Sequence, residues 1–211
     1  MRRQPRGHVK ALLERSSSTT LGGSTPRPRW DWLRRAPLFR PKPQVAAPVS
    51  RRVHGKVLRL AANMDTDRII PARFMQDWEH LGDHVFEGED AGLPTRAKAS
   101  AFVVAGRNFG CGSSREQAVM AIKQSGIRCV IAPTFAGIFY RNAVNLALAV
   151  LEADVDCADG AELDVDLVTG KIVEPASGRS WQANPMPDVA RRIVEDGGLV
   201  EHMKKRYDAK R

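Results

Sequence analysis

Short apolar runs separated by helix-like stretches constrain this chain most strongly, because they set the class of fold that it can adopt. Residues 101–105 (AFVVA) and 129–132 (CVIA) are apolar and bounded by Gly or Pro, as expected of strands buried on both faces. Residues 114–124 between them have the pattern of a helix that ends at Gly126. The same reasoning predicts strands at 53–60, 146–151, 162–168 and 172–174, and helices at 135–144, around 189–194 and from 199 onward. This order of strands and helices predicts an α/β domain.

The positive charge of the chain is confined to its first quarter. The 211 residues carry a net charge of +9. Residues 1–52 contain 13 basic residues against two acidic ones, Glu14 and Asp31, whereas residues 53–211 contain 20 basic and 22 acidic residues. The body of the chain is therefore nearly neutral, and its composition does not indicate a nucleic-acid partner.

We interpret residues 1–52 as a disordered, basic extension in front of a folded domain at 53–211. The extension holds seven of the 13 prolines, a polar run at 16–20 and no apolar periodicity, so it buries too little apolar surface to offset its ordering entropy. Three interpretations stay open: an organellar transit peptide, an electrostatic arm in which Trp30 and Trp32 stack on nucleic acid or meet a membrane, and an extension without function. We favour the third, and with it a cytoplasmic protein; a transit peptide would place the protein in an organelle.

Two classes of protein are excluded by what the chain lacks. No apolar run approaches the 18 residues of a membrane span, which excludes an integral membrane protein. The three cysteines, Cys111, Cys129 and Cys157, form no CxxC pair and no cluster with histidines, so neither a disulfide framework nor a zinc site is predicted. Cys111 could act as a nucleophile, although no paired His is identifiable, and the other two are expected to pack as small residues.

The strongest chemical signal is the segment 106–116 (GRNFGCGSSRE), which leads from an apolar strand into a helix. Its three glycines allow a tight turn and a close approach of the backbone to a ligand. Ser113 and Glu116 have the spacing of a capping box, which predicts that the helix starts at Ser113. A helix N-terminus with two hydroxyl groups and Arg115 favours a bound carboxylate or phosphate, although a capped helix without a ligand stays open. The glycines match neither a Walker loop nor a dinucleotide fingerprint.

Two further segments place polar residues on an apolar background. Residues 63–74 (NMDTDRIIPARF) have the pattern of an Asx-rich turn that begins a strand or a helix. Arg141 and Asn142 lie on a mostly apolar helix, where a charged residue is more often the partner of a buried carboxylate than a contact to a ligand.

Taken together, the segments 65–73, 108–116 and 138–143 closely resemble the small subunits of 3-isopropylmalate dehydratases, in the aconitase superfamily. The resemblance covers residues 53–206. It implies a three-layer β/β/α swivel domain that closes over a large subunit. It also implies that the large subunit holds a [4Fe–4S] cluster, in agreement with the lack of a thiolate set in this chain. The reaction implied is a hydro-lyase step of leucine biosynthesis, the conversion of 2-isopropylmalate to 3-isopropylmalate by loss and return of water.

The resemblance also assigns roles to residues of the glycine-rich segment. Ser113 is implied to be the base that takes the proton next to a substrate carboxylate, and the helix N-terminus and Arg115 are the features that could stabilise its alkoxide. Ser114 and Arg115 are implied to hold a substrate carboxylate, the arginine through its planar set of donors. The remaining residues implied to bind substrate are Asp67, Arg73 and Trp78.

Three positions depart from the pattern of the family. Gln117 stands where the family usually has His, Gly137 where it usually has Arg, and Thr134 where it has Ser. These departures leave open a non-catalytic anion-binding module that keeps the fold without the chemistry. The intact serines and arginine at 113–115 argue against that alternative.

The loop 74–78 lies where the family sets its choice of substrate. Homoaconitases, which act on a longer tricarboxylic acid, use an Arg in this loop, whereas this chain has Trp78 at the approximate position, with Asp77 beside it. This favours a substrate with an apolar substituent. Dehydratases of other hydroxy diacids, such as 2,3-dimethylmalate, citramalate or homoaconitate, stay open as alternatives.

Overall fold

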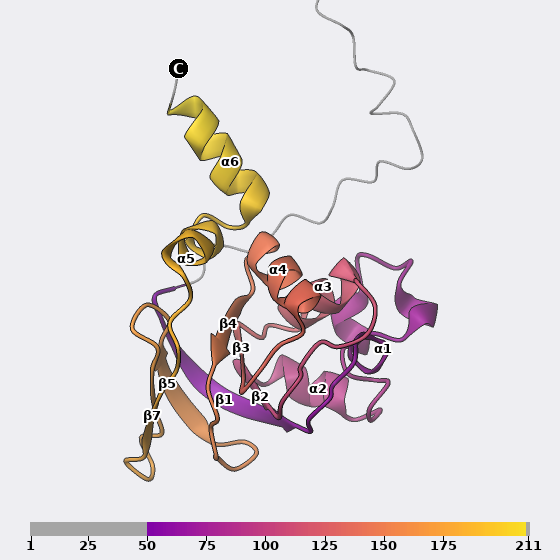
Figure 1. Cartoon of the computed structure of the whole chain (residues 1–211). Coiled ribbons are helices and arrows are strands. Elements are labelled where there is room, and N and C mark those ends of the chain that lie inside the picture. The colour runs from indigo at the N-terminus through magenta and orange to yellow at the C-terminus, as the bar shows by residue number, and fades with distance from the viewer. Residues whose placement is uncertain (1–49, 210–211) are drawn as a thin grey trace, which may run out of the picture. The chain divides into compact units, whose positions relative to one another are not determined.

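The computed structural model of the protein describes residues 50–209 (Figure 1). Almost all of the extension expected at 1–52 therefore lies outside the described residues. The strands are β1 (Arg52–Leu60), β2 (Phe102–Ala105), β3 (Cys129–Ala132), β4 (Ala149–Glu152), β5 (Glu162–Asp166), β6 (Lys171–Val173) and β7 (Ser180–Gln182). The helices are α1 (Thr66–Ile69), α2 (Leu93–Lys98), α3 (Glu116–Gln124), α4 (Gly137–Asn145), α5 (Asp188–Glu195) and α6 (Leu199–Asp208), with short 3-10 turns η2 (Ala72–Phe74) and η3 (Leu81–His84).

Strand β1 joins the two halves of a seven-stranded sheet of order β4-β3-β2-β1-β5-β6-β7. Its residues 57–60 pair in parallel with β2, and its residues 52–56 pair antiparallel with β5. At the change of partner, a Cβ on Gly55 would lie only 2.6 Å from the Cβ of Ala101, so the close passage of the two segments requires glycine. Strand β1 is therefore shared by the parallel half and the antiparallel half of the sheet.

The burial pattern of β1 changes where its partner changes. In the part paired with β5, the buried Val53 lies between exposed neighbours, whereas in the part paired with β2 the adjacent Val57 and Leu58 are both buried. Such a change is expected where a strand passes from a sheet with one wet face into a parallel sheet that is covered on both faces. Strands β2 and β3 are accordingly buried at every residue.

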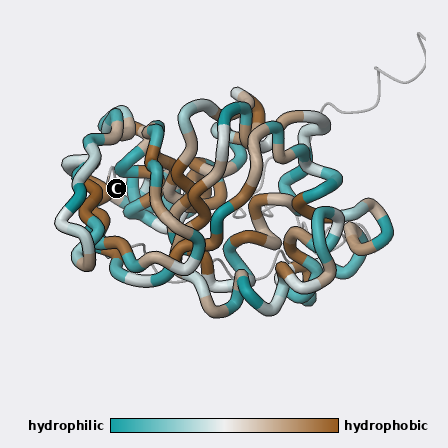
Figure 2. Tube along the Cα trace, turned by 90° about the horizontal axis from the view of Figure 1, so that it is seen from below, coloured by the Kyte–Doolittle hydropathy of each residue, from teal (hydrophilic) through white to brown (hydrophobic). Residues whose placement is uncertain are grey.

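Helices α3 and α4 lie side by side above the parallel strands, and β5, β6 and β7 continue the sheet away from them (Figure 1). The apolar residues gather in the centre of the described region, and hydrophilic residues occupy the peripheral loops (Figure 2). This arrangement confirms the predicted α/β swivel fold of the β/β/α type. No helix among the described residues is long and apolar enough to cross a membrane.

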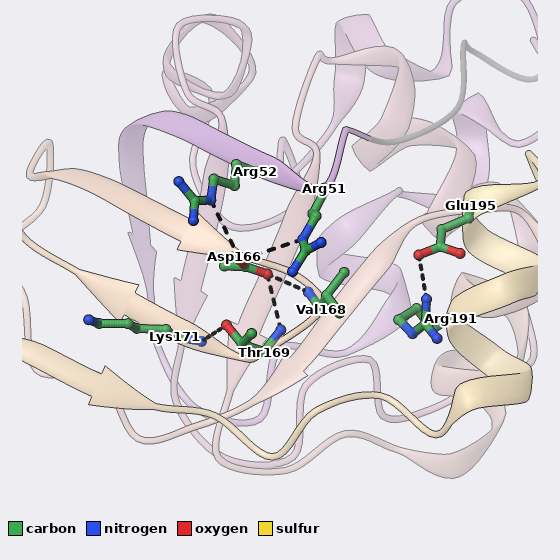
Figure 3. Close-up of polar contacts among 8 residues, drawn as sticks. All are labelled: Arg51, Arg52, Asp166, Val168, Thr169, Lys171, Arg191 and Glu195. Carbon is green, nitrogen blue, oxygen red and sulfur yellow. Dashed lines mark hydrogen bonds and ion pairs between the residues drawn. The ribbon is translucent and has the colours of Figure 1, made fainter.

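The antiparallel half is held at its outer turn by Asp166 (Figure 3). Its Oδ1 accepts hydrogen bonds from the backbone N–H groups of Val168 (2.9 Å) and Thr169 (3.0 Å). Its Oδ2 lies 3.7 Å from Nε of Arg51 and 3.5 Å from Nε of Arg52. Partial burial opposes ionisation, but the two backbone hydrogen bonds and the arginines outweigh it and lower the pKa of Asp166. The carboxylate therefore fixes the hairpin predicted between 162 and 174.

Most of the predicted elements are confirmed, and the differences occur at helix ends and in short elements. The predicted strand at 146–151 begins later, at Ala149, because Leu146 and Ala147 still belong to the turn that ends α4. The short helix α2 and the edge strand β7 were not predicted, since neither has a clear apolar period in the sequence.

Candidate active site

The glycine-rich loop joins the three segments that the sequence analysis singled out. On one side, the N–H of Gly110 donates to the carbonyl of Met64 (2.7 Å), and the N–H of Thr66 donates to the carbonyl of Cys111 (2.9 Å). On the other side, the N–H of Phe109 donates to the carbonyl of Thr134 at 3.0 Å. Segments separated by more than 20 residues in the sequence thus meet around one loop.

Two glycines of this loop combine a positive φ with a close approach to a neighbouring helix. Gly110 has φ +76°, and a Cβ there would lie 2.2 Å from Cγ of the buried Phe139 on α4. Gly112 has φ +95°, and its Cβ would lie 3.3 Å from the hydroxyl oxygen of Thr66 on α1. The glycines therefore let the loop press against α4 on one side and α1 on the other, as the sequence analysis expected of a close backbone approach.

Two asparagines brace the base of the loop. Asn63 and Asn108 both have left-handed backbones, with φ 56° and 60°. The side-chain amide of Asn108 donates a hydrogen bond to Oδ1 of Asn63 (3.0 Å), and its backbone N–H donates to Oγ1 of Thr134 (2.8 Å). The sequence analysis did not assign them a role; the tolerance of Asn for positive φ was the only available signal.

The predicted capping box is wrong. Helix α3 begins at Glu116, its N-cap is Arg115 with an extended backbone, and no side chain caps it. Ser113 and Ser114 therefore do not form the first turn of the helix but precede it in the loop, where both are exposed. The extended backbone of Arg115, with φ −115° and ψ 109°, interrupts the helical conformation between Ser114 and Glu116. The two hydroxyl groups lie just before the N-terminal end of α3 and are open to a ligand.

Arg115 is held in place by Asp67. The Nη1 of Arg115 donates to Oδ1 of Asp67 on α1, and the arginine side chain is only 16% exposed against 61% for the aspartate. The pair links the start of α3 to α1, whose own first turn is capped by the Asp65 side chain accepting from the N–H of Arg68 (2.8 Å). Of the predicted site residues, the structure thus brings Ser113, Ser114, Arg115 and Asp67 together.

Arg73 is engaged elsewhere. Its Nη2 donates to Oε1 of Glu87 (2.9 Å), and its guanidinium lies 4.5 Å from the ring centre of Phe74. That ring stacks on His84 at 3.6 Å, and His84 in turn contacts Glu87 through Nδ1 at 2.6 Å. The hydrogen bond from His84, followed by the one from Arg73, lowers the pKa of Glu87 and keeps it ionised. The structure shows no contact between Arg73 and residues 113–115.

Trp78 lies at the other end of α3. Its carbonyl accepts a hydrogen bond from Nε2 of Gln124, the last residue of that helix (2.8 Å), and its half-buried ring packs against the core. Nine helical residues span about 13 Å, which separates this anchor from the serines before the helix. The structure therefore does not bring Trp78 next to Ser113.

The expectation that Arg141 pairs with a buried carboxylate is wrong for the described residues. The side chain is exposed on α4, and among residues 50–209 it forms no ion pair with a buried carboxylate. Asn142 is half-buried on the same helix. The neighbouring Ile138 is also exposed, at 44%, which leaves this face of α4 open.

The cysteines do not fit an iron–sulfur cluster in this chain. Cys129 is buried within β3, Cys157 is buried beyond β4, and only Cys111 lies in the glycine-rich loop. Burial raises the pKa of the Cys129 thiol far above its ordinary value, which opposes formation of a thiolate ligand. Among the described residues, no group of three or more His, Cys, Asp or Glu side chains is placed to hold a metal ion.

A groove of about 610 Å³ lies on the antiparallel half, away from the candidate site. It is lined by residues of β1, β5, β6 and their connections, including Arg52, His54 and Asp164. None of the residues that line it belongs to the three segments of the site. The candidate site of this chain by itself is an open surface at the start of α3.

Comparison with known proteins agrees with this geometry. The Aconitase C-terminal domain family matches residues 65–155, which contain all three segments. The 3-isopropylmalate dehydratase small subunit of Thermodesulfovibrio yellowstonii is 42% identical over 160 residues, covering 74% of this chain and 95% of that protein. The chain belongs to the family of 3-isopropylmalate dehydratase small subunits. The family is one of hydro-lyase subunits, which confirms the resemblance and the expectation of an enzyme subunit.

Two further similar proteins carry the names of two different enzymes. The solved structure of a 3-isopropylmalate dehydratase from Methanocaldococcus jannaschii has a TM-score of 0.72 and 38% identity, covering 75% of this chain and 97% of that one. The methanogen homoaconitase small subunit of Methanothermobacter thermautotrophicus is 44% identical over 158 residues, covering 74% of this chain and 93% of that protein. Identity alone therefore does not separate the two substrate classes.

Proposed function

We propose that this chain is the small subunit of a 3-isopropylmalate dehydratase, which converts 2-isopropylmalate to 3-isopropylmalate in leucine biosynthesis. The observation that carries the proposal is the exposure of Ser113 and Ser114 directly before α3, beside an Arg115 that Asp67 holds in place. An open surface of this kind needs a second surface to enclose a substrate. We therefore propose that the chain acts only with a large subunit.

In this proposal Ser113 takes the proton from the carbon next to a substrate carboxylate. A serine hydroxyl in water is far too weak a base, so its alkoxide must be stabilised. The N-terminal end of α3 and the positive charge of Arg115 supply favourable electrostatic interactions for that alkoxide. The large subunit, not this chain, would hold a [4Fe–4S] cluster, which supplies a Lewis acid for the substrate hydroxyl group.

Arg115 and Ser114 bind the carboxylate next to the reacting carbon. A guanidinium has five N–H donors in a planar fork, and the bond to Asp67 uses one of its two terminal nitrogens. The remaining donors can bind a carboxylate with two parallel hydrogen bonds. The Ser114 hydroxyl adds a third donor from the same exposed turn. Asp67 acts in this scheme by orienting Arg115.

We propose that the loop 74–78 contributes to the choice of substrate without contacting Ser113 or Ser114. Arg73 is already paired with Glu87 and stacked on Phe74, so it is a poor candidate for an extra carboxylate. Trp78 at the end of the loop offers an apolar ring. Both features favour a substrate with an isopropyl group.

The second candidate is a homoaconitase small subunit, which the 44% identity to the Methanothermobacter protein supports. Its substrate carries one more carboxylate and requires one more cation. The two candidates differ in the charge that the loop 74–78 must bind, so they can be separated by substrate.

The test is to purify this chain anaerobically with a candidate large subunit and to follow dehydration of 3-isopropylmalate by the ultraviolet absorbance of the alkene. We expect activity that requires both chains and exceeds the activity on homoaconitate-type acids. A stable complex that is active only on the longer acid would establish the second candidate. Failure of the chain to bind any cluster-bearing subunit would reject both and favour an anion-binding module.

We also propose that residues 53–211 form the catalytic domain and that residues 1–49 of the extension before it are dispensable for catalysis. A chain that starts at Ser50 keeps the contacts of Arg51 and Arg52 with Asp166, and it should form the same complex with the same turnover number. Loss of activity in that chain would assign the extension a role in the enzyme, and loss of nucleic-acid binding alone would assign it an arm function.

A further inference from the structure

Thr66 carries a buried hydroxyl group without a partner. The residue is 1% exposed, and within residues 50–209 its Oγ1 is the one buried side-chain nitrogen or oxygen that has no hydrogen bond. The backbone of Thr66 is fully used, since its N–H donates to Cys111 (2.9 Å) and its carbonyl accepts from Ile70 (3.0 Å). The side chain alone is unsatisfied.

An unsatisfied buried hydroxyl is unfavourable, and a Val of the same shape would avoid the penalty. Buried polar groups without a partner are rare in folded proteins, and each calls for an explanation. A hydroxyl group at this position is therefore explained best by a partner that it gains when the site is complete.

The location of the hydroxyl identifies that partner. A Cβ on Gly112 would lie 3.3 Å from Oγ1 of Thr66, so the hydroxyl lies directly under the turn whose next residue is Ser113. The carboxylates of the neighbouring residues already accept hydrogen bonds, Asp65 from the N–H of Arg68 and Asp67 from Arg115. Ser113 itself is exposed, so its hydroxyl group is accessible to a new partner.

We propose that Thr66 is a positioning residue for Ser113. When the complex closes on its substrate, the Thr66 hydroxyl donates a hydrogen bond to Oγ of Ser113 and holds it toward the carbon that loses its proton. This inference rests on the proposed function, in which Ser113 is the base. A hydrogen bond to the charged form of the serine would favour that form and so increase turnover without changing substrate binding.

The test compares Thr66→Val, which keeps the shape and removes the hydroxyl, with Thr66→Ser, which keeps the hydroxyl. Both variants are assayed in complex with the large subunit. We expect Thr66→Val to lower kcat by about tenfold or more with KM changed by less than about twofold. Thr66→Ser should retain most of the turnover, and the melting temperature of Thr66→Val should equal or exceed that of the wild type.

Three results would overturn the inference: an unchanged kcat in Thr66→Val, a rise in KM that accounts for the whole loss, or a similar loss in Thr66→Ser. If the Thr66→Val complex does not assemble, Thr66→Ser and Thr66→Ala are compared instead. Equal turnover of these two variants would overturn the inference, and a loss of turnover only in Thr66→Ala would support it.

Ser113→Ala is measured alongside. A Ser113→Ala complex as active as the wild type, or an inactive wild-type complex, rejects the proposed function and this inference with it. A normal Thr66→Val beside an inactive Ser113→Ala rejects only the role of Thr66.

Discussion

Arg115 and Asp67, which are 48 positions apart in the sequence, form an ion pair in which the arginine is largely shielded from solvent and the aspartate is not. The pair connects α1 with the start of α3 and fixes the direction of the guanidinium. In the proposed function, the donors of Arg115 that Asp67 does not use bind the substrate carboxylate.

Replacing Asp67 with Ala should therefore impair catalysis by releasing Arg115. We expect kcat/KM to fall by about 10- to 100-fold, because misorientation of a binding group is costly in the transition state. The measurement is steady-state kinetics of the reconstituted complex. Glu195→Ala, which breaks an ion pair of Arg191 on α5 (Figure 3), is the matched control and should leave the kinetics unchanged. Wild-type kcat/KM in Asp67→Ala would refute the orienting role.

Gly110→Ala should destabilise the domain by roughly 2–4 kcal/mol, because the new methyl group meets the buried Phe139 ring and φ is positive. Gly126→Ala is the matched control, since Gly126 also has a positive φ but a Cβ there meets no atom within 4 Å. Because only backbone strain changes in this control, its free energy of unfolding should fall by only about 1 kcal/mol. Urea unfolding of the three proteins measures the difference. Equal losses would mean that the loop does not press on α4.

Ala147→Gly should stabilise the protein. The N–H of Leu148 donates to Ala143 and that of Ala147 to Val144, so Ala147 ends α4 in a Schellman motif with φ 58°. Glycine adopts this conformation without strain, and we expect a gain of about 0.5–1 kcal/mol. Gly197 ends α5 in the same way, so Gly197→Ala should show a loss of similar size in thermal unfolding. A loss in Ala147→Gly would show that packing of the methyl group outweighs the strain.

Lys123 should make stability depend on pH in the alkaline range. Its Nζ donates to the carbonyl of Leu146, and burial lowers its pKa from 10.5 to about 8. The unfolded chain then binds more protons than the native one between these values, so stability relative to Lys123→Met should rise from about pH 8 to about pH 10.5 and be lowest below pH 8. Denaturant unfolding across this range measures the effect.

The exposed Lys171 provides the matched Lys→Met control, which reports the effect of the substitution itself. A flat difference between wild type and Lys123→Met across the same range would mean that the amine is as well solvated in the native state as in the unfolded one.

The fold was predictable where burial sets the sequence pattern. Apolar runs such as 129–132 are fully buried strands in the structure, and their order along the chain defines the parallel half. Elements that depend on tertiary contacts were missed, as with α2 and β7, whose residues have no period of their own. The capping box failed because the spacing of Ser113 and Glu116 is only a local signal, and the backbone of Arg115 between them is extended in the folded chain.

The site was predictable as a set of segments but not as a geometry. The motifs containing Asp67 and Arg115 identified residues that do pair in space. No sequence pattern indicated that Glu87 engages Arg73, or that Gln124 anchors Trp78 at the far end of α3. Those contacts depend on how the loop after α1 packs, and only the three-dimensional structure defines that packing.

The most direct test of the account is hydrogen exchange at the substrate carbon in deuterated water, catalysed by the complex of this chain with a large subunit. Nuclear magnetic resonance would follow deuterium entering the position next to the carboxylate. We predict that Ser113→Ala still binds the large subunit but exchanges about 10²- to 10⁴-fold more slowly than the wild type, because the base is gone. Exchange at the wild-type rate in an intact Ser113→Ala complex would show that this chain does not supply the base.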